Sequence, residues 1–383
     1  MPSRYAELGV DVKKRGVEAF KERLEVLFPE AFCPIQRDPD APGRGLVAHT
    51  DSAGSKPVPA YLHWRETGDP RWFRGLAQDV VAMNLDDIIC VGADPLCFLD
   101  YVALNPLKVD KEALLKALAE GFGGCFSTLD RYGVKVLFSG GETADLPDQL
   151  RTLDVSGSIF GRVDLEKVVT GQRIREGDLI VGLRSGGRTV YERGENSGIM
   201  CNGLTLARLS LMDGEYQRRY PELGEPGERR YRGRFKFDDY LDELGMTVGE
   251  ALLSPTRLYA PVVKRILERC GGAVHGLVHN TGGGVTKCLR VGRNIRYVKD
   301  HLPDPDPIFL LIQREAGVEW REMFEDYNMG IGFEVIVDAE SAEEVLSVAD
   351  SFKLGAQVIG HCERAEGEKA LIIRNRFGVF RYP

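Results

Sequence analysis

The sequence of 383 residues lacks the two commonest nucleotide-binding signatures. It contains no G-x-x-x-x-G-K-[ST] P-loop, and no G-x-G-x-x-G motif follows a predicted strand and opens a helix. Any nucleotide that this chain uses is therefore expected to be held by other means.

Long apolar runs and clustered cysteines are missing as well. No stretch approaches about 18 uninterrupted apolar residues, and the N-terminus has no apolar signal core, so no membrane role is expected. A net charge of −8 argues against a nucleic-acid partner. The eight cysteines show no C-x-x-C spacing and sit mostly among apolar neighbours, which is typical of reduced thiols in a cytoplasmic protein.

Helical and strand patterns alternate along the chain and predict a mixed α/β (α+β) protein. The length favours two domains. We expect an N-terminal domain over residues 1–168 and a C-terminal domain over residues 169–383. Helices are predicted over 11–27, 76–89, 110–131, 255–270 and 340–353, and strands over 45–56, 96–104, 134–144, 151–163, 171–183 and 332–338, before a terminal pair of strands.

The helix over 76–89, LAQDVVAMNLDDII, carries Asp79, Asp86 and Asp87 without one Lys or Arg. Acids near a helix C-terminus oppose the helix dipole, so a positive partner is expected from elsewhere. Asp79 and Asp86 lie about 10 Å apart along the axis and are too distant to chelate one ion together. One of the final pair could instead share a cleft with Asp51, where Mg²⁺ bound to nucleotide phosphates needs only one or two carboxylates. Three solvated acids are the alternative.

Residues 50–56, TDSAGSK, place a carboxylate, a glycine and a lysine at the end of a predicted strand. Asp51 and Lys56 could hold a metal ion and a phosphate together. An Asx turn followed by a surface lysine would give the same pattern.

Two glycine-rich turns could also contact a ligand. In SGGETAD (139–145) the glycines expose Glu142 and Thr143 at the mouth of a sheet, although a plain strand-to-loop turn fits equally. In HNTGGGVTK (279–287), Gly282, Gly283 and Gly284 precede a short helix and form a candidate anion cradle, with His279 and Lys287 beside it.

A charged stretch interrupts the second half of the chain. Residues 218–243 mix basic and acidic side chains with two prolines, which favours a solvated surface insertion near 213–245. The RRYRGRFK segment within it has acidic flanks and is not interpreted as a nucleic-acid patch.

Taken in order, these segments resemble one family. GVDVKKRG, TDSAGSK, GADP after Asp87, LCFLDY, SGGETAD, GDLIVGL, NGLTLAR, SPTRLY, HNTGGG and YNMGIG are similar to aminoimidazole ribonucleotide synthetase, also called phosphoribosylformylglycinamidine cyclo-ligase. The similarity spans most of the chain, and members of this superfamily use ATP without a P-loop.

The resemblance implies a homodimer whose N-terminal strands form a barrel across two subunits, an α/β sandwich-like C-terminal domain, and ATP with Mg²⁺ between the domains. The implied reaction converts formylglycinamidine ribonucleotide to aminoimidazole ribonucleotide, ADP and phosphate. Carried across by position, Asp51 and Asp87 match metal and phosphate ligands, Glu142 an active-site carboxylate, and His279 with Gly282 to Gly284 the substrate loop. Lys56, Asp79, Asp86, Thr143 and Asn202 are the remaining expected cofactor contacts.

Three departures from the family pattern separate this chain from a typical member. LFPEAFCPIQRDPDAPGRG stands in place of a glycine-rich stretch, and Asp51-Ser-Ala-Gly-Ser-Lys56 in place of Asp-Gly-Val-Gly-Thr-Lys. Met200 replaces a histidine before the Asn-Gly segment, so Arg188 or Arg193 would substitute for it, or the substrate differs.

Two further readings remain open on the sequence. A related small-molecule phosphotransferase or selenophosphate synthetase would share the ATP site, but the latter places a reactive cysteine in a glycine-rich loop that Cys33 lacks. A non-catalytic nucleotide-binding relative would explain the loss of the histidine at Met200.

Overall fold

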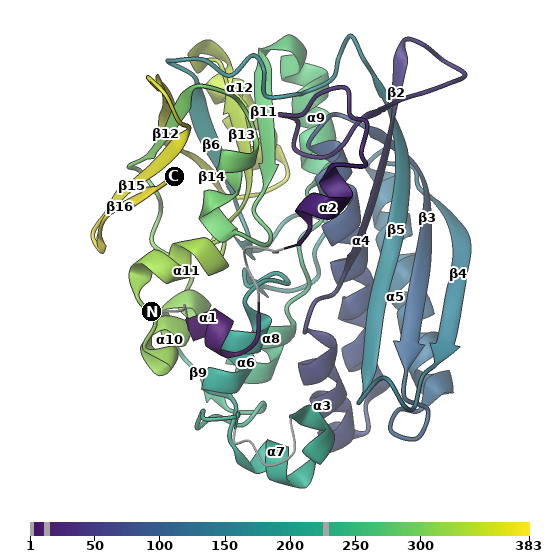
Figure 1. The fold of residues 1–383 in the computed structure, drawn as a ribbon. Helices are drawn as coiled ribbons and strands as arrows, with labels where there is room; N and C mark the ends of the chain where they lie inside the picture. Colours follow the sequence, from purple (N-terminus) through teal and green to yellow (C-terminus); the bar gives the residue numbers. More distant parts are fainter. Residues whose placement is uncertain (1–3, 11–15, 225–229) are drawn as a thin grey trace.

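The computed structural model describes residues 4–10, 16–224 and 230–383, which form two β-sheets with helices packed between and around them (Figure 1). The first sheet has the strand order β1-β2-β5-β3-β4 and comprises β1 (Gln36–Arg37), β2 (Arg44–Ser52), β3 (Asp94–Leu104), β4 (Leu137–Asp145) and β5 (Leu153–Asp164). The second has the order β11-β13-β6-β14-β12-β15-β16 and draws all its strands from residues beyond 178. This division agrees with a mixed α/β fold; the boundary near residue 168 stays a prediction.

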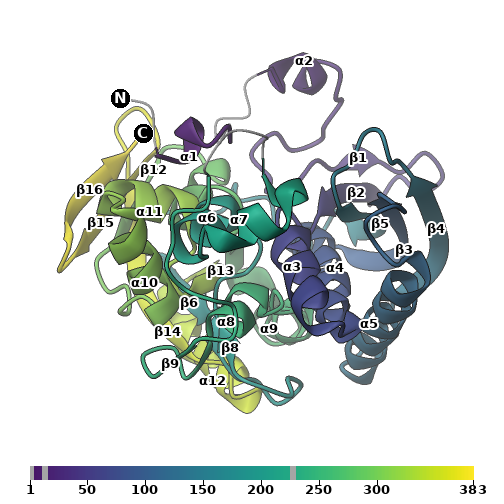
Figure 2. The same cartoon turned by 90° about the horizontal axis from the view of Figure 1, so that it is seen from below.

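Helices cover only one face of the first sheet. The strand β5 alternates buried and partly exposed residues, because every second side chain faces α4 (Arg74–Ile89) and α5 (Lys111–Arg131). No described element packs on the opposite face, which forms one side of the molecule in Figure 2. The helix α4 is buried along almost its whole length, because the rest of the molecule covers the side that faces away from the sheet.

The second sheet consists of β6 (Leu179–Arg184), β11 (Val274–His279), β12 (Ile295–Lys299), β13 (Ile331–Val337), β14 (Ala356–Arg364), β15 (Ala370–Asn375) and β16 (Gly378–Tyr382). The strand β13, which lies between β11 and β6, is buried at every residue. Around it lie α6 (Leu204–Leu211), α8 (Val248–Leu253), α9 (Ala260–Cys270), α10 (Pro307–Ala316), α11 (Trp320–Asp326) and α12 (Ala342–Ser351). The helix α9 contacts both α4 and α12, so it joins the two halves.

Most predicted elements are present, with shifted ends. The helix expected over 11–27 is instead the short α2 (Glu18–Lys21), and residues 11–15 lie outside the described part. The helix expected from 255 begins at Ala260, because Asp86 caps the backbone there. Among the described residues, no helix is long and apolar enough to cross a membrane.

The charged insertion packs more closely than predicted. It contains α7 (Glu215–Arg219), β9 (Tyr240–Leu241) and β10 (Met246–Thr247), and residues 225–229 lie outside the described part. Tyr216 and Tyr231 are buried in it, and Glu222 accepts a hydrogen bond from Tyr61 of α3 (Pro57–Thr67) at 2.5 Å. Most charged side chains of the insertion are exposed, as charge balance predicts, whereas its aromatic side chains anchor it, with the Phe237 ring 4.1 Å from that of His63 on α3.

Candidate active site

Asp87 lies between two histidines that belong to different sheets. Its Oδ1 is 2.8 Å from Nδ1 of His279, the last residue of β11. Its Oδ2 is 3.2 Å from Nε2 of His49 on β2. His279 is fully buried, whereas the His49 side chain is 21% exposed, so this group reaches the surface through His49.

The electrostatic surroundings keep Asp87 ionised. Burial by itself raises its pKa, but the hydrogen bond from His279 and the positive charges of Lys287 and His49 outweigh burial and hold the pKa well below the ordinary value. Burial lowers the pKa of His279, against the opposing effect of Asp87. A neutral His279 that donates from Nδ1 to Asp87 presents Nε2 as an acceptor, and this buried atom has no partner among the described residues.

Asn84, one turn before Asp87 on α4, links the pair to the end of β2. Its Oδ1 is 3.3 Å from Nδ1 of His49, and its Nδ2 donates to the carbonyl of Asp51 at 3.2 Å. The Asp51 carboxylate accepts from the N–H of Ser52 at 2.8 Å. Asp51 thus lies on the same side of β2 as His49 but about 7 Å further along the strand.

The site offers few side chains that could bind a Mg²⁺ ion. Among the described residues, no group of three or more His, Cys, Asp or Glu side chains could hold a metal ion. Magnesium that arrives with nucleotide phosphates needs only one or two protein carboxylates. Asp51 fits that need directly, whereas Asp87 would first have to exchange a histidine contact.

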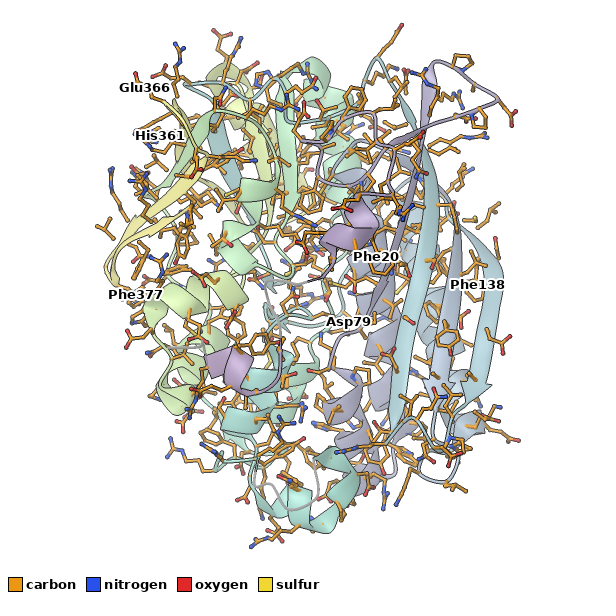
Figure 3. All side chains as sticks on the ribbon, viewed as in Figure 1. Phe20, Asp79, Phe138, His361, Glu366 and Phe377 are labelled. Carbon is orange, nitrogen blue, oxygen red and sulfur yellow. The ribbon has the colours of Figure 1, made fainter. Side chains whose placement is uncertain are left out.

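Lys56 and Asp79 form a buried ion pair rather than a cleft surface. The Lys56 Nζ donates to Asp79 Oδ1 and to the carbonyl of Ser254, both at 2.7 Å. The same Asp79 oxygen accepts from the N–H and the hydroxyl of Thr256, each at 2.7 Å. Both charged side chains are fully buried, and Figure 3 shows Asp79 in the interior. The direct nucleotide contact expected for them therefore has no surface to act through, and the pair instead ties α3 and α4 to residues 254–256.

Asp86 supplies the cap of another helix. Its two carboxylate oxygens accept from the N–H of Tyr259 at 3.0 Å and of Ala260 at 2.9 Å, at the start of α9. The helix N-terminus is the positive group that the sequence of α4 lacks at this position. Lys56 is the positive partner of Asp79, and Lys287 and His49 supply the positive charge near Asp87. The predicted cofactor contact of Asp86 is replaced by this helix cap.

The glycine turn after His279 is shaped by close backbone packing. Gly283 and Gly284 have φ of 99° and 51°, and a Cβ at Gly284 would lie 2.3 Å from the carbonyl oxygen of Tyr327. In the described part of the chain, the N–H groups of Gly282 and Gly283 donate no hydrogen bond. Asn202 lies beside Gly282, and its buried Nδ2 has no partner among the described residues.

A fully buried hydrogen-bond network fixes the backbone on either side of this glycine turn. Lys299 Nζ donates to Glu334 at 2.6 Å and to the carbonyl of Val285 at 2.7 Å. Asn280, next to His279, donates to the same Glu334 oxygen at 2.7 Å. These charge-assisted bonds fix the backbone on both sides of the three glycines.

The site of the replaced histidine is closed. Met200 is 1% exposed, has a φ of 58°, and its sulfur lies beside Gly332. Neither arginine proposed as a substitute lies with the Asp87 group. Arg188 donates to the carbonyl of Glu192, and Arg193 lines a separate cavity of 460 Å³ with Arg74. That cavity has none of His49, Asp87 or His279 in its lining.

Glu142 and Thr143 lie on β4, the edge strand of the first sheet. Glu142 pairs with Tyr101, an exposed residue on the sheet face opposite α4, and therefore points away from Asp87. The structure thus joins His49, Asp87 and His279 by direct contacts, links the Asp51 backbone to them through Asn84, and leaves Glu142 apart.

Sequence reasoning missed His49 and Asn84, and it placed Lys287 beside the glycine turn but not beside Asp87. Strand alternation could have found His49, because residues 49 and 51 of a strand share a face. The helical period could have found Asn84, because residues 84 and 87 of α4 lie on one side. The contacts to His279 and Lys287 come from nearly 200 residues away and have no local signal.

Comparison with known proteins first defines the class. Residues 35–163 match the family described as AIR synthase related protein, N-terminal domain. A solved structure of a ThiL protein complexed with AMPPCP and TMP is similar in fold, with a TM-score of 0.56 at 13% identity over 96% of each chain. The fold is therefore that of the AIR synthase-related proteins.

Curated relatives narrow this to one enzyme family. A phosphoribosylformylglycinamidine cyclo-ligase of Methanocaldococcus jannaschii is 36% identical, with 82% of this chain and 77% of the relative covered. The protein of the same name from Methanococcus vannielii is 34% identical over 94% and 92%. The chain belongs to the phosphoribosylformylglycinamidine cyclo-ligase family, and is thus an enzyme of the ligase class that forms a C–N bond.

Proposed function

We propose that the site around Asp87 carries out the ATP-dependent ring closure of formylglycinamidine ribonucleotide to aminoimidazole ribonucleotide, with release of ADP and phosphate. The single observation that carries the proposal is the contact of Asp87 with both His49 and His279, 3.2 and 2.8 Å away, beside the glycine turn of residues 282–284. This junction unites residues of both sheets, as a two-domain active site requires.

The chemistry needs little covalent help from the protein. An amide oxygen is a poor leaving group, so transfer of the γ-phosphoryl group to the formyl oxygen turns that oxygen into phosphate. The neighbouring amidine nitrogen then attacks the same carbon, the C–N bond forms, and the C–O bond breaks as phosphate leaves. Positioning the two ends for an intramolecular attack supplies much of the rate enhancement.

Individual residues have distinct tasks in this proposal. The ionised Asp87 orients His279 and His49, and the partly exposed His49 is the member of this group that can reach a substrate, whereas the buried His279 holds Asp87 in place. Asp51 is the carboxylate available to the magnesium ion of MgATP. The glycine N–H groups and Asn202 face anionic oxygens, whereas Lys56, Asp79 and Asp86 hold the scaffold behind them.

The proposal extends to a homodimer. The uncovered face of the first sheet carries exposed Tyr101 and Phe160, at 41% and 44%, and an apolar face of this kind favours a partner. Glu142 points to the same face, so it would serve an active site through contact with a second copy, whereas Thr143 pairs with the buried Val102 and lies on the helix-covered face. The eight free cysteines, most of them buried, support a location in the reducing cytoplasm.

The direct test incubates the purified protein with MgATP and formylglycinamidine ribonucleotide and measures ADP together with the diazotisable aminoimidazole product. Equal amounts of both products are expected. ATP hydrolysis that ignores the ribonucleotide would favour the phosphotransferase reading, and nucleotide binding without turnover would favour a non-catalytic relative. The relatives named above carry the cyclo-ligase name and favour neither alternative.

A further inference from the structure

Phe32 lies against two basic side chains, Lys287 and Arg290, of the short helix that follows the glycine turn. It belongs to residues 28–35, within the stretch that replaces a glycine-rich segment of the resembling family. The ring is 4% exposed, and its centroid lies 5.5 Å from Lys287 Nζ and 5.6 Å from the guanidinium carbon of Arg290.

The segment around Phe32 is anchored at both ends. The N–H of Leu27 donates to the carbonyl of Ile35 at 2.9 Å, which closes the segment on itself. Glu30, 5% exposed, accepts from Arg293 at 2.8 Å and so ties the segment to the loop before β12. The ring of Phe32 is therefore held at a fixed place beside Lys287.

The ammonium group of Lys287 points toward the glycine turn. Its Nζ donates to the hydroxyl of Thr281 at 2.7 Å. Its charge acts on Asp87, whose carboxylate it helps to keep ionised. The ammonium group thus lies among the glycine turn, Thr281 and Asp87.

We propose that Phe32 is a positioning residue that holds the Lys287 ammonium where it binds a phosphate oxygen of the substrate or of the nucleotide. The inference rests on the proposed function of this site. A lysine side chain has four rotatable bonds and loses entropy when it is fixed. An aromatic ring attracts an ammonium group through its face and so favours one position of the lysine side chain.

A double-mutant cycle tests this arrangement. Phe32→Leu, Lys287→Met and the double variant are compared with the matched control Phe28→Leu in the same segment. Binding of inorganic phosphate and of MgADP is measured by calorimetry, and kcat and KM are measured separately. We expect Phe32→Leu to weaken binding about five- to thirtyfold, the range of a desolvated cation–π contact.

In the Lys287→Met background, Phe32→Leu should change binding less than about twofold, because its effect passes through the lysine. Phe32→Trp should retain most of the affinity, and Phe28→Leu should bind as the wild type does. Phe32→Met serves as a second ringless variant if the leucine variant does not fold.

Equal losses in both lysine backgrounds would overturn the proposal, because Phe32 would then act only through general packing. Unchanged binding in Phe32→Leu, or no measurable binding by the wild-type protein, would overturn it as well. The binding measurements need no turnover, so a wild-type protein that binds MgADP but makes no aminoimidazole product would refute the proposed function alone.

Discussion

Replacing Asp87 with asparagine is the sharpest test of the central contact. The change keeps the shape of the side chain but removes the charge that faces His279 at 2.8 Å and His49 at 3.2 Å. Hydrogen bonds to a charged group contribute roughly 1.5–3 kcal/mol each, and relief from burying a charge offsets part of that loss. We therefore expect Asp87→Asn to lower the free energy of unfolding by about 2–4 kcal/mol.

The loss of kcat in Asp87→Asn should be larger than partial unfolding of the variant would explain. Without the anion, the tautomer and orientation of both histidines are no longer fixed, and a loss of preorganised electrostatics typically costs about 100-fold or more in kcat. Denaturant unfolding and steady-state kinetics of the purified variant measure the two effects. Asp130→Asn, an exposed site on α5, is the matched control and should change neither.

The pH dependence gives an independent check. Because the folded pKa of Asp87 is depressed, its contribution to stability is complete above the ordinary value near 4 and is lost as the pH falls below it. The stability gap between wild type and Asp87→Asn should therefore be constant from about pH 5 upward and shrink below pH 4. Turnover within twofold of the wild type in Asp87→Asn would refute the assigned role.

Three other variants test parts of the same scaffold. Burial lowers the pKa of His63 to about 3, so folding favours its neutral form. The free energy of unfolding should therefore fall by up to about 1.4 kcal/mol per pH unit as the pH drops below 6.5. His63→Leu should reduce that acid sensitivity in urea titrations. Lys299→Met leaves the fully buried Glu334 without its ion partner and should cost about 3–5 kcal/mol of stability, measured by thermal unfolding against Lys264→Met on the exposed part of α9. Gly284→Ala should weaken MgADP binding at least tenfold, because its Cβ would approach the carbonyl of Tyr327 to 2.3 Å. The control is Gly177→Ala, which is also at positive φ but in open space. Calorimetry that shows normal affinity in Gly284→Ala would contradict the packing argument.

The regular elements of the fold could be predicted from the sequence because they obey local rules. The helix α4 and the strand β5 appear at the expected places, because an apolar stripe marks the helix and one-sided burial gives the strand its alternation. The strand β14 and the helices α10 and α11 were missed, although Pro307 at the start of α10 and Gly317 after its end are local signals that could have found that helix. The length of α2 was overestimated.

The candidate site could be predicted only in part. Asp51, Asp87 and His279 were found as members of motifs, and the structure brings them to one junction. The sequence could not separate Asp87, which faces the histidines, from Asp86, which caps α9, because the two residues are adjacent and chemically identical. Lys56 and Asp79 resembled ligand contacts because a buried ion pair uses the same residue types as a phosphate site.

The most direct measurement follows the oxygen atom that leaves. Formylglycinamidine ribonucleotide labelled with ¹⁸O in its formyl group is converted with MgATP, and the released phosphate is analysed by mass spectrometry. Transfer of the phosphoryl group to the formyl oxygen predicts one ¹⁸O atom in the phosphate for each aminoimidazole formed. Unlabelled phosphate alongside ring-closed product would contradict that chemistry.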